Sequence, residues 1–145
     1  MGRKLLLQHI NEPGIHTFDV YRQKGGYRAV EKALKTMSTD EVVEEVKKSG
    51  LRGRGGAGFP TGMKWSFLAK PEGVARYLVC NGDESEPGTF KDRFLMTHIP
   101  HALIEGMIVS SYALGASVSY IYVRGEMMPQ IRILERAIQE AKAAG

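Results

Sequence analysis

The most constraining feature of this sequence is a strand–helix pattern that occurs twice in its second half. RYLVC (76–80) is short and rich in aliphatic residues, as a buried strand is, and SVSYIYV (117–123) has the pattern of another strand. A helical pattern follows each of them, at 100–116 and at 129–145, and each helix has a proline in its first turn. Because strand–helix–strand connections are right-handed and make parallel strands, the sequence predicts an α/β fold with a parallel sheet covered by helices.

Two strands are few for a sheet, since an isolated strand pair is only marginally stable. We therefore expect further strands from a continuation of the chain, from another chain, or from segments without a clear strand pattern. The 145 residues correspond to one domain. No apolar run approaches the roughly 18 residues of a transmembrane helix, and the run Leu5–Leu7 is too short for a signal peptide. These features favour a cytoplasmic protein.

The first half of the chain is predicted to be helical up to a glycine-rich segment. Residues 14–37 contain an irregular lead-in followed by a helix with apolar residues at helical spacing. A second helix is expected over 39–48, with Ser38 or Thr39 as its N-cap and two lysines in its last turn.

The glycine-rich segment is GLRGRGGAGFPTGMKW (50–65). Gly53, Gly55 and Gly58 match the G-x-G-x-x-G pattern, but a predicted helix precedes them where a standard dinucleotide-binding turn needs a strand. A Walker A loop is excluded because Met63 stands where that motif has lysine. Glycines still permit close backbone approach, so successive amides of this segment can converge on an anion.

Positive charge gathers around the same segment, although the net charge of the whole chain is only +4. An acid-free basic cluster suits a phosphate-bearing ligand. A solvated basic face, a purely structural glycine turn and an RGG-type RNA-binding module are the alternatives, and the single copy of RGRGG between structured segments disfavours the RNA-binding module. Between 46 and 71 the basic residues are Lys47, Lys48, Arg52, Arg54, Lys64 and Lys70.

A second polar segment, NGDESEPGTFKDR (81–93), directly follows the first predicted strand. Ligands of open α/β sheets bind outside the carboxyl ends of the strands. An EF-hand is excluded, because Pro87 and Phe94 stand at two of its ligand positions. Hydrogen bonding to sugar hydroxyls, magnesium binding and a plain surface turn stay open. The side chains expected at this edge are Asn81, Asp83, Glu84, Ser85 and Glu86.

Cysteine and histidine give weaker signals. Cys80 is the one cysteine, which rules out an intrachain disulfide and a cysteine-held cluster, and we expect a core thiol. His98 and His101 flank a proline at a helix start without an evident third ligand, so capping and packing are favoured over metal binding.

Together the two polar segments strongly resemble the flavin- and NADH-binding subunit (the F-type subunit) of bacterial respiratory complex I, NADH:quinone oxidoreductase. The motifs are GLRGRGGAGFPTGMKWSF (50–67) and YLVCNGDESEPGTFKDR (77–93), and the resemblance continues through HALIEGMI and YIYVRGE to cover about residues 20–140. Similar domains occur in NAD-dependent formate dehydrogenases and NAD-reducing hydrogenases. The matching flavin subunit of such an enzyme is therefore the alternative.

The resemblance implies a Rossmann-like FMN- and NADH-binding domain that begins within this chain. Residues 1–37 would be the lead-in and helix, and 38–145 the first part of that domain. The residues that match FMN contacts are Gly53, Arg54, Gly55, Gly56, Gly58, Lys64, Asn81, Asp83, Glu84 and Ser85. Those that match NADH contacts are Phe59, Phe67 and Glu86, the two aromatic residues stacking on adenine.

In this family NADH gives a hydride to FMN, which passes single electrons to an iron–sulfur cluster. No side chain need act as an acid or base, so no catalytic or metal-binding residue is expected in this segment. The resemblance implies other peripheral-arm subunits of complex I as partners, among them an iron–sulfur subunit. It implies no nucleic acid, no direct membrane insertion and a place at the cytoplasmic face of the inner membrane.

Full-length members continue with a second half of the flavin site, a β-rich domain and a helical domain that holds a [4Fe–4S] cluster. None of these occurs in this sequence. We therefore expect the cluster only in a full-length protein. This segment alone is expected to bind FMN poorly and to be inactive.

Overall fold

The computed structural model describes residues 5–69 and 73–145, which divide into two compact units. β1 (Tyr77–Gly82), β2 (Val118–Val123) and α6 (Pro100–Leu114) each contribute residues to both units. The first unit comprises Met1–Arg28, Cys80–Gly106 and Ile121–Gly145, and the second comprises Ala29–Val79 and Met107–Tyr120.

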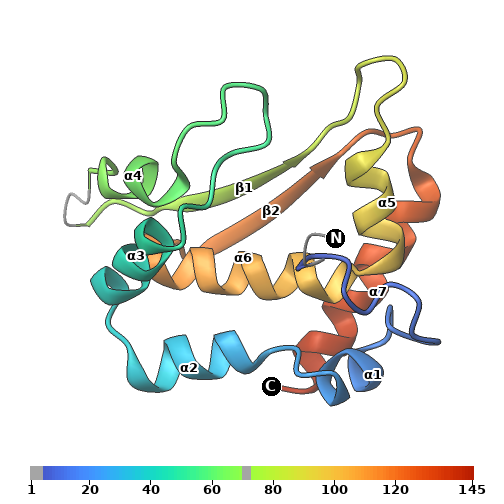
Figure 1. Cartoon of the computed structure of the whole chain (residues 1–145), viewed down its shortest axis with the longest axis horizontal. Coiled ribbons are helices and arrows are strands. Elements are labelled where there is room, and N and C mark those ends of the chain that lie inside the picture. Colours follow the sequence, from blue (N-terminus) through green and yellow to red (C-terminus); the bar gives the residue numbers. More distant parts are fainter. Residues whose placement is uncertain (1–4, 70–72) are drawn as a thin grey trace. The chain divides into compact units, whose positions relative to one another are not determined.

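β1 and β2 form a two-stranded parallel sheet, with α6 as the connection between them (Figure 1). The α/β class and the flanking helices predicted from the strand–helix pattern are confirmed. The strands approach closely near their carboxyl ends. A Cβ atom on Gly82 would lie 2.9 Å from the carbonyl oxygen of Tyr122, so a side chain at this position would push the strands apart.

One expectation about the sheet is wrong. The strand at 76–80 was predicted to be buried, but its residues alternate, and Tyr77 and Val79 are 61% and 60% exposed. Tyr120 of β2 lies beside Tyr77 on this face, with ring centroids 6.4 Å apart. A strand covered on one face shows this alternation, because successive side chains point to opposite sides. Cys80 is accordingly only half-buried, and this burial, followed by the charge of Asp92, raises the pKa of its thiol.

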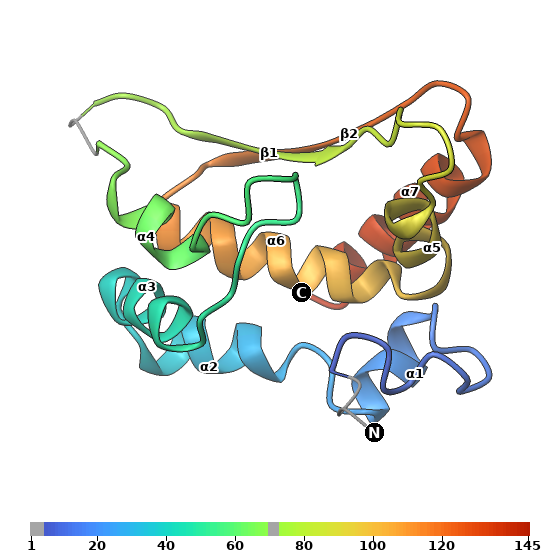
Figure 2. The same cartoon turned by 45° about the horizontal axis from the view of Figure 1, so that its top comes forward.

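Three helices surround the core of the second unit: α2 (Arg28–Thr36), α3 (Thr39–Lys48) and α4 (Thr61–Ser66). α3 begins with a capping box, in which Ser38 Oγ accepts from the Glu41 backbone and Glu41 accepts from the Ser38 backbone. α4 packs closely on α3 (Figure 2). A Cβ atom on Gly62 would lie 2.5 Å from the Lys47 backbone nitrogen, so this helix pair depends on glycine. The buried core residues are Ala33, Val42, Val43 and Ala113.

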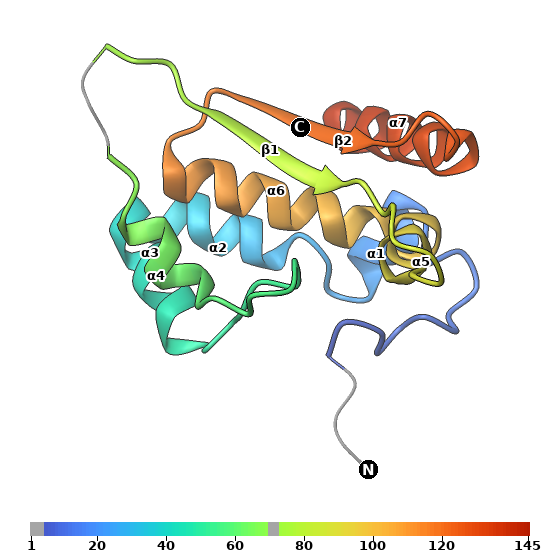
Figure 3. The ribbon, with the colours of Figure 1, turned by 90° about the horizontal axis from the view of Figure 1, so that it is seen from above.

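The first unit contains α1 (Phe18–Gln23), α5 (Lys91–His98) and α7 (Met128–Ala143). The chain leaves β1 through an irregular loop that leads into α5 (Figure 3). α5 packs against α7 through Met96, Met127 and Leu134, which are all buried. Within the described parts of the chain, no helix is long and apolar enough to cross a membrane.

A buried polar network joins three segments of the first unit. His101 of α6 is completely buried; its Nδ1 lies 2.8 Å from Tyr27 Oη and its Nε2 lies 3.1 Å from Glu140 Oε2. Glu140 also accepts hydrogen bonds from the Phe18 backbone and from Arg136 Nε. The expected packing role of His101 is confirmed, whereas its hydrogen-bond partners, far away in the sequence, were not predicted.

Candidate functional site

The glycine-rich segment forms a closed loop in the second unit, projecting from its two flanking helices α3 and α4 (Figure 1). Arg52 and Pro60 form an antiparallel bridge at its base. The Gly53 amide donates to the Phe59 carbonyl at 2.9 Å, and the Thr61 amide donates to the Leu51 carbonyl at 2.8 Å. The segment is therefore an ordered loop with a hydrogen-bonded neck, unlike a disordered RGG arm.

The tip of this loop is open. Gly56 and Gly58 have φ angles of 110° and 61°, a left-handed region that favours glycine. A Cβ atom on Gly55, Gly56 or Gly58 would meet nothing within 4 Å. Gly55 has no positive φ, and a Cβ atom there would meet no atom of the described residues. Neither backbone conformation nor packing within the described chain therefore requires glycine at this position. Room for another molecule against the backbone is what a flavin phosphate site requires, so the loop fits the predicted cofactor.

Two aromatic rings lie beside one another after the loop. Phe59 and Phe67 are 45% and 70% exposed, and their ring centroids are 6.4 Å apart with planes tilted by 55°. Exposed aromatic faces can stack on a planar base. The two residues predicted to contact adenine thus come from opposite ends of α4, and the fold brings them together.

The basic residues around the loop differ in their surroundings. Arg54 and Lys64 are exposed, whereas Lys47 forms an ion pair of 2.6 Å with Glu44 one turn earlier in α3. Arg52 donates from Nη1 to the Gly58 carbonyl at 3.0 Å. Lys70 lies outside the described residues.

The second polar segment forms a hydrogen-bonded turn in the first unit, and it begins with Asn81, which lies in β1, one residue before the strand ends. Asn81 Oδ1 accepts from the Asp83 amide at 3.0 Å, and Asp83 Oδ2 accepts from Ser85 Oγ at 2.7 Å. Arg124, which follows β2, places its Nε 3.7 Å from Asp83 Oδ1 and also pairs with Glu126. The loops after the two parallel strands therefore meet at the carboxyl edge of the sheet, where ligands of such sheets bind.

Glu84 has a structural role that was not predicted. Its side chain is turned inward and the residue is 2% exposed. The carboxylate accepts from the Asp92 amide at 2.7 Å and from the Arg93 amide at 3.1 Å, both in the first turn of α5, with Arg93 Nε at 3.4 Å. Burial alone would raise the pKa of Glu84, but these hydrogen bonds and the nearby positive charges outweigh it and hold the pKa below 4.5. The charged carboxylate thus anchors this loop to α5.

Glu86, in contrast, is exposed at the far end of the same loop. Its carbonyl oxygen accepts from the Thr89 amide at 3.1 Å, which closes a turn around Pro87 and Gly88. The carboxylates of Glu84 and Glu86 are thus only two residues apart but have opposite surroundings, one enclosed and one available to a ligand.

The predicted contacts fall into two groups. The glycine loop, Lys64 and the aromatic pair belong to the second unit, and the turn after β1 belongs to the first unit. Each group is brought together within its own unit.

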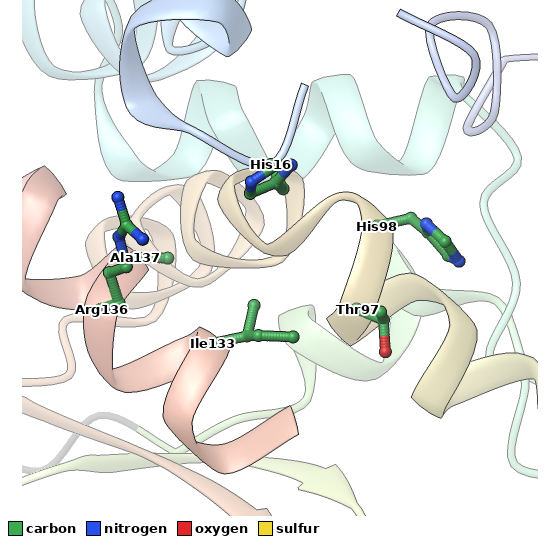
Figure 4. A pocket seen from close by; sticks show the side chains of 6 residues that line it. All are labelled: His16, Thr97, His98, Ile133, Arg136 and Ala137. Atoms are coloured by element: carbon green, nitrogen blue, oxygen red, sulfur yellow. The ribbon is translucent and has the colours of Figure 1, made fainter. Parts of the chain in front are cut away.

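A cavity of about 370 Å³ in the first unit contains none of the predicted site residues (Figure 4). It lies among the lead-in, α5 and α7, and Ile133 and Ala137 of α7 are among the residues that line it. Arg136 and His16 flank it, but the Arg136 Nε is already bonded to Glu140. Figure 4 shows His98 directed away from Ile133, and its ring centroid is 4.4 Å from that of Phe94. In the ranges 5–69 and 73–145 no three His, Cys, Asp or Glu side chains are grouped as metal ligands would be.

Sequence reasoning missed two arginines that hold the predicted loops. Arg52 was assigned only to the general basic cluster, because a side chain that returns to its own loop leaves no periodic signal. Arg124 could have been found, since it is the first residue after the second strand and so belongs to the same sheet edge as Asp83.

Residues 46–145 match the family model described as the Nuo51 FMN-binding domain. That match covers more than half of the chain, and the chain belongs to this family.

Curated relatives carry the same resemblance over nearly the whole chain. An F subunit of the NADH-quinone oxidoreductase of Rhizobium meliloti is 55% identical over 145 residues, which are all of this chain and 34% of the relative. The F subunit of the NADH-quinone oxidoreductase of Escherichia coli is 55% identical over 128 residues, 88% of this chain and 29% of the relative. The chain spans about a third of the length of the curated relatives that it matches.

Solved structures of NAD+-reducing [NiFe]-hydrogenase contain a similar fold. The air-oxidized form matches with a TM-score of 0.68 and 35% identity, over 97% of this chain and 23% of that chain. The H2-reduced form matches with a TM-score of 0.65 and 46% identity, over 73% of this chain and 18% of that chain.

Proposed function

We propose that this chain contributes to the electron-input subunit of an NADH:quinone oxidoreductase, where it binds FMN and NADH. The observation that carries the proposal is the FMN-binding family match over 46–145, together with relatives at 55% identity that are named as F subunits of NADH-quinone oxidoreductase. When bound, FMN supplies the group that takes the electron pair of NADH and releases electrons singly to an iron–sulfur centre of the larger protein.

The glycine loop is proposed to hold the phosphate end of FMN. Its open face over Gly55, Gly56 and Gly58 lets a ligand approach the backbone, and Gly53 lies at its hydrogen-bonded neck. Arg54 and Lys64 supply positive charge that offsets a phosphate, since both are exposed and lie on or beside the loop.

The end of β1 and the turn after it are proposed to bind the ribityl chain and ring of FMN. Asn81, Asp83 and Ser85 offer amide, carboxylate and hydroxyl groups, which are the partners that a polyol requires. Glu84 remains in the proposed set with a changed role, because its carboxylate faces α5 and thereby fixes the position of the turn.

NADH is proposed to bind through the aromatic pair and Glu86. Phe59 and Phe67 present exposed ring faces suited to adenine. The exposed carboxylate of Glu86 can accept hydrogen bonds from ribose hydroxyls of the nicotinamide nucleotide. No side chain of the set acts as an acid or base, so the chain contributes orientation and binding.

As part of this proposal, residues 38–145 form the first part of the FMN- and NADH-binding domain, after a lead-in and a helix over 1–37. The partners are other peripheral-arm subunits of the complex, including an iron–sulfur subunit that receives the electrons. The protein then lies at the cytoplasmic face of the inner membrane through the complex, and the [4Fe–4S] cluster belongs to the larger protein.

A second candidate is the flavin subunit of an NAD-linked hydrogenase or formate dehydrogenase. The two hydrogenase structures with TM-scores of 0.65 and 0.68 favour it. The quinone-linked function has the stronger support, because the curated relatives that carry its name are more similar in sequence, at 55% against 46% and 35% identity.

The test is to purify the native gene product with the subunits that accompany it. NADH oxidation is measured with a quinone as acceptor, and NAD+ reduction is measured with formate and with hydrogen as donors. NADH-driven quinone reduction is expected. Reduction of NAD+ by hydrogen or formate would support the second candidate. The absence of any NADH-dependent reaction, combined with RNA binding that weakens steeply with salt, would favour the RNA-binding alternative.

A further inference from the structure

We propose that Arg52 is a positioning residue of the FMN site, acting by holding the carbonyl of Gly58 and thereby fixing the tip of the glycine loop. This inference rests on the proposed function. Arg52 is not itself assigned a contact with the cofactor. Its effect is transmitted through the backbone that the cofactor would approach.

The neck of the loop is a short antiparallel ladder. Arg52 and Pro60 oppose each other as a non-hydrogen-bonded pair, flanked by the Gly53–Phe59 and Thr61–Leu51 hydrogen bonds. Proline is suited to this position, because the amide of a residue in such a pair is not needed by the ladder.

Beyond the neck, the side chain of Arg52 binds the backbone near the tip of the loop. Hydrogen-bonded and non-hydrogen-bonded pairs alternate along an antiparallel ladder, so in a continued ladder Arg54 and Gly58 would again be a non-hydrogen-bonded pair. Within the described residues, the ladder stops at the Gly53–Phe59 bond, and the Gly58 carbonyl accepts from the side chain of Arg52, with Nη1 at 3.0 Å. The guanidinium thus supplies the Gly58 carbonyl with a donor that a backbone ladder would not provide, next to the positive φ angles of Gly56 and Gly58.

Fixing this carbonyl also fixes the amide of the next residue. The peptide between Gly58 and Phe59 is planar and trans, so its N–H points opposite to the carbonyl that Arg52 holds. Arg52 therefore sets the direction of one loop amide and the entry of the chain into Phe59. The proposed phosphate-binding backbone depends on the direction of this amide, and the position of the Phe59 ring depends on the path of the chain at this point.

The shape of the guanidinium distinguishes positioning from simple charge. Arginine carries a planar fork on a long stem, whereas lysine carries a single ammonium with a different reach. If Arg52 acted only through its positive charge, lysine would replace it fully. If it acts by holding one carbonyl in one direction, lysine would restore only part of its effect.

The experiment uses the native protein with its accompanying subunits, in wild-type form and as R52Q, R52K and K48Q. Lys48→Gln is the matched control, since it removes one exposed positive charge from the same basic cluster. Two quantities are measured: the FMN dissociation constant after removal and titration of the cofactor, and amide hydrogen exchange of residues 53–59 without FMN. Thermal unfolding is recorded alongside to establish that each variant is folded.

For R52Q we expect an FMN dissociation constant raised about tenfold, faster exchange in 53–59 and little change in thermal unfolding, because Arg52 is exposed. R52K should lie between R52Q and wild type, and K48Q should stay within about twofold of wild type. Unchanged exchange in R52Q, or full recovery in R52K, would overturn the positioning role. An unchanged dissociation constant in R52Q, with wild type binding FMN, would overturn this inference alone. A wild-type protein that binds no FMN would contradict the proposed function itself.

Discussion

Tyr27 Oη lies 2.8 Å from Nδ1 of the completely buried His101, and this contact joins the end of the lead-in to the start of α6. The roles of the two groups are set by Glu140 on the other side of the ring. A charged carboxylate only accepts, so His101 Nε2 carries the proton toward Glu140 and Nδ1 accepts from Tyr27. Burial and the charges of Glu105 and Glu140 raise the pKa of Tyr27, which keeps its hydroxyl a donor.

Removing this donor should cost stability. Tyr27→Phe leaves the ring in place but deprives a buried nitrogen of its partner, and we expect a loss of about 1–3 kcal/mol in the free energy of unfolding. Urea titration followed by circular dichroism measures it. Tyr122→Phe is the control, because Tyr122 is exposed and its hydroxyl can be replaced at little cost. Equal stability of Tyr27→Phe and wild type would contradict this assignment.

The same histidine should make stability depend on pH. Burial lowers the pKa of His101 from its usual 6.5, with a smaller effect from the neighbouring His16, while Glu140 partly opposes the shift. With a lower pKa in the folded state, the unfolded chain binds the proton first as pH falls below about 6.5. The free energy of unfolding should therefore decrease on acidification from about pH 6.5 toward the folded-state pKa.

Replacing the titrating ring tests the origin of that slope. In His101→Gln the pH dependence between about pH 7 and pH 5 should be reduced, since glutamine does not titrate. His98→Gln is the matched control, because His98 is exposed, and it should retain the wild-type slope. A wild-type slope in His101→Gln would assign the effect to other groups.

Substitutions of two neighbouring glutamates should have different effects, one on the stability of the fold and the other on NADH binding. Glu84→Gln removes the charge that accepts three hydrogen bonds at the start of α5, and we expect a loss of about 1.5–3 kcal/mol in stability. Glu86→Gln changes an exposed side chain, so thermal unfolding should be unaffected while the KM for NADH rises. Steady-state kinetics with NADH and thermal unfolding are measured on both variants. The reverse pattern would contradict the division of roles.

The sequence predicted the elements whose signals are local. The helix expected over 39–48 is α3 at Thr39–Lys48, with Ser38 as its N-cap. It could be predicted because the residues of the capping box and the lysines of the last turn all lie within this short segment. The strand at 117–123 and the helix at 129–145 also correspond to observed elements, at Val118–Val123 and Met128–Ala143.

The elements that were missed depend on partners outside the elements themselves. α5 has little amphipathic pattern, and its first turn is held by Glu84, which lies outside the helix. The six-residue α1 is joined to α7 through the Phe18 amide and Glu140, which are 122 residues apart. Neither contact leaves a periodic signal in the sequence, and the same is true of the Arg52–Gly58 hydrogen bond within the candidate site.

Close packing of α4 on α3 gives a further prediction. Gly62→Ala would place a methyl group about 2.5 Å from the Lys47 backbone nitrogen, and backbone cannot move aside as a side-chain tip can. We expect a loss of about 1–3 kcal/mol in the free energy of unfolding, as for overpacked cores. Gly106→Ala in α6 is the control, since its added methyl group meets nothing within 4 Å and alanine favours a helix by about 0.5–1 kcal/mol. Unchanged stability of Gly62→Ala would show that α4 can shift on α3.

We propose that this chain belongs to a flavoprotein that takes electrons from NADH. The most direct measurement is the visible absorption spectrum of the native protein, purified with its accompanying subunits, before and after anaerobic addition of NADH. We expect about one FMN per chain, and we expect the flavin absorption bands to bleach when NADH is added. A protein without flavin, or one whose flavin bands stay unchanged in the presence of NADH, would contradict this proposal.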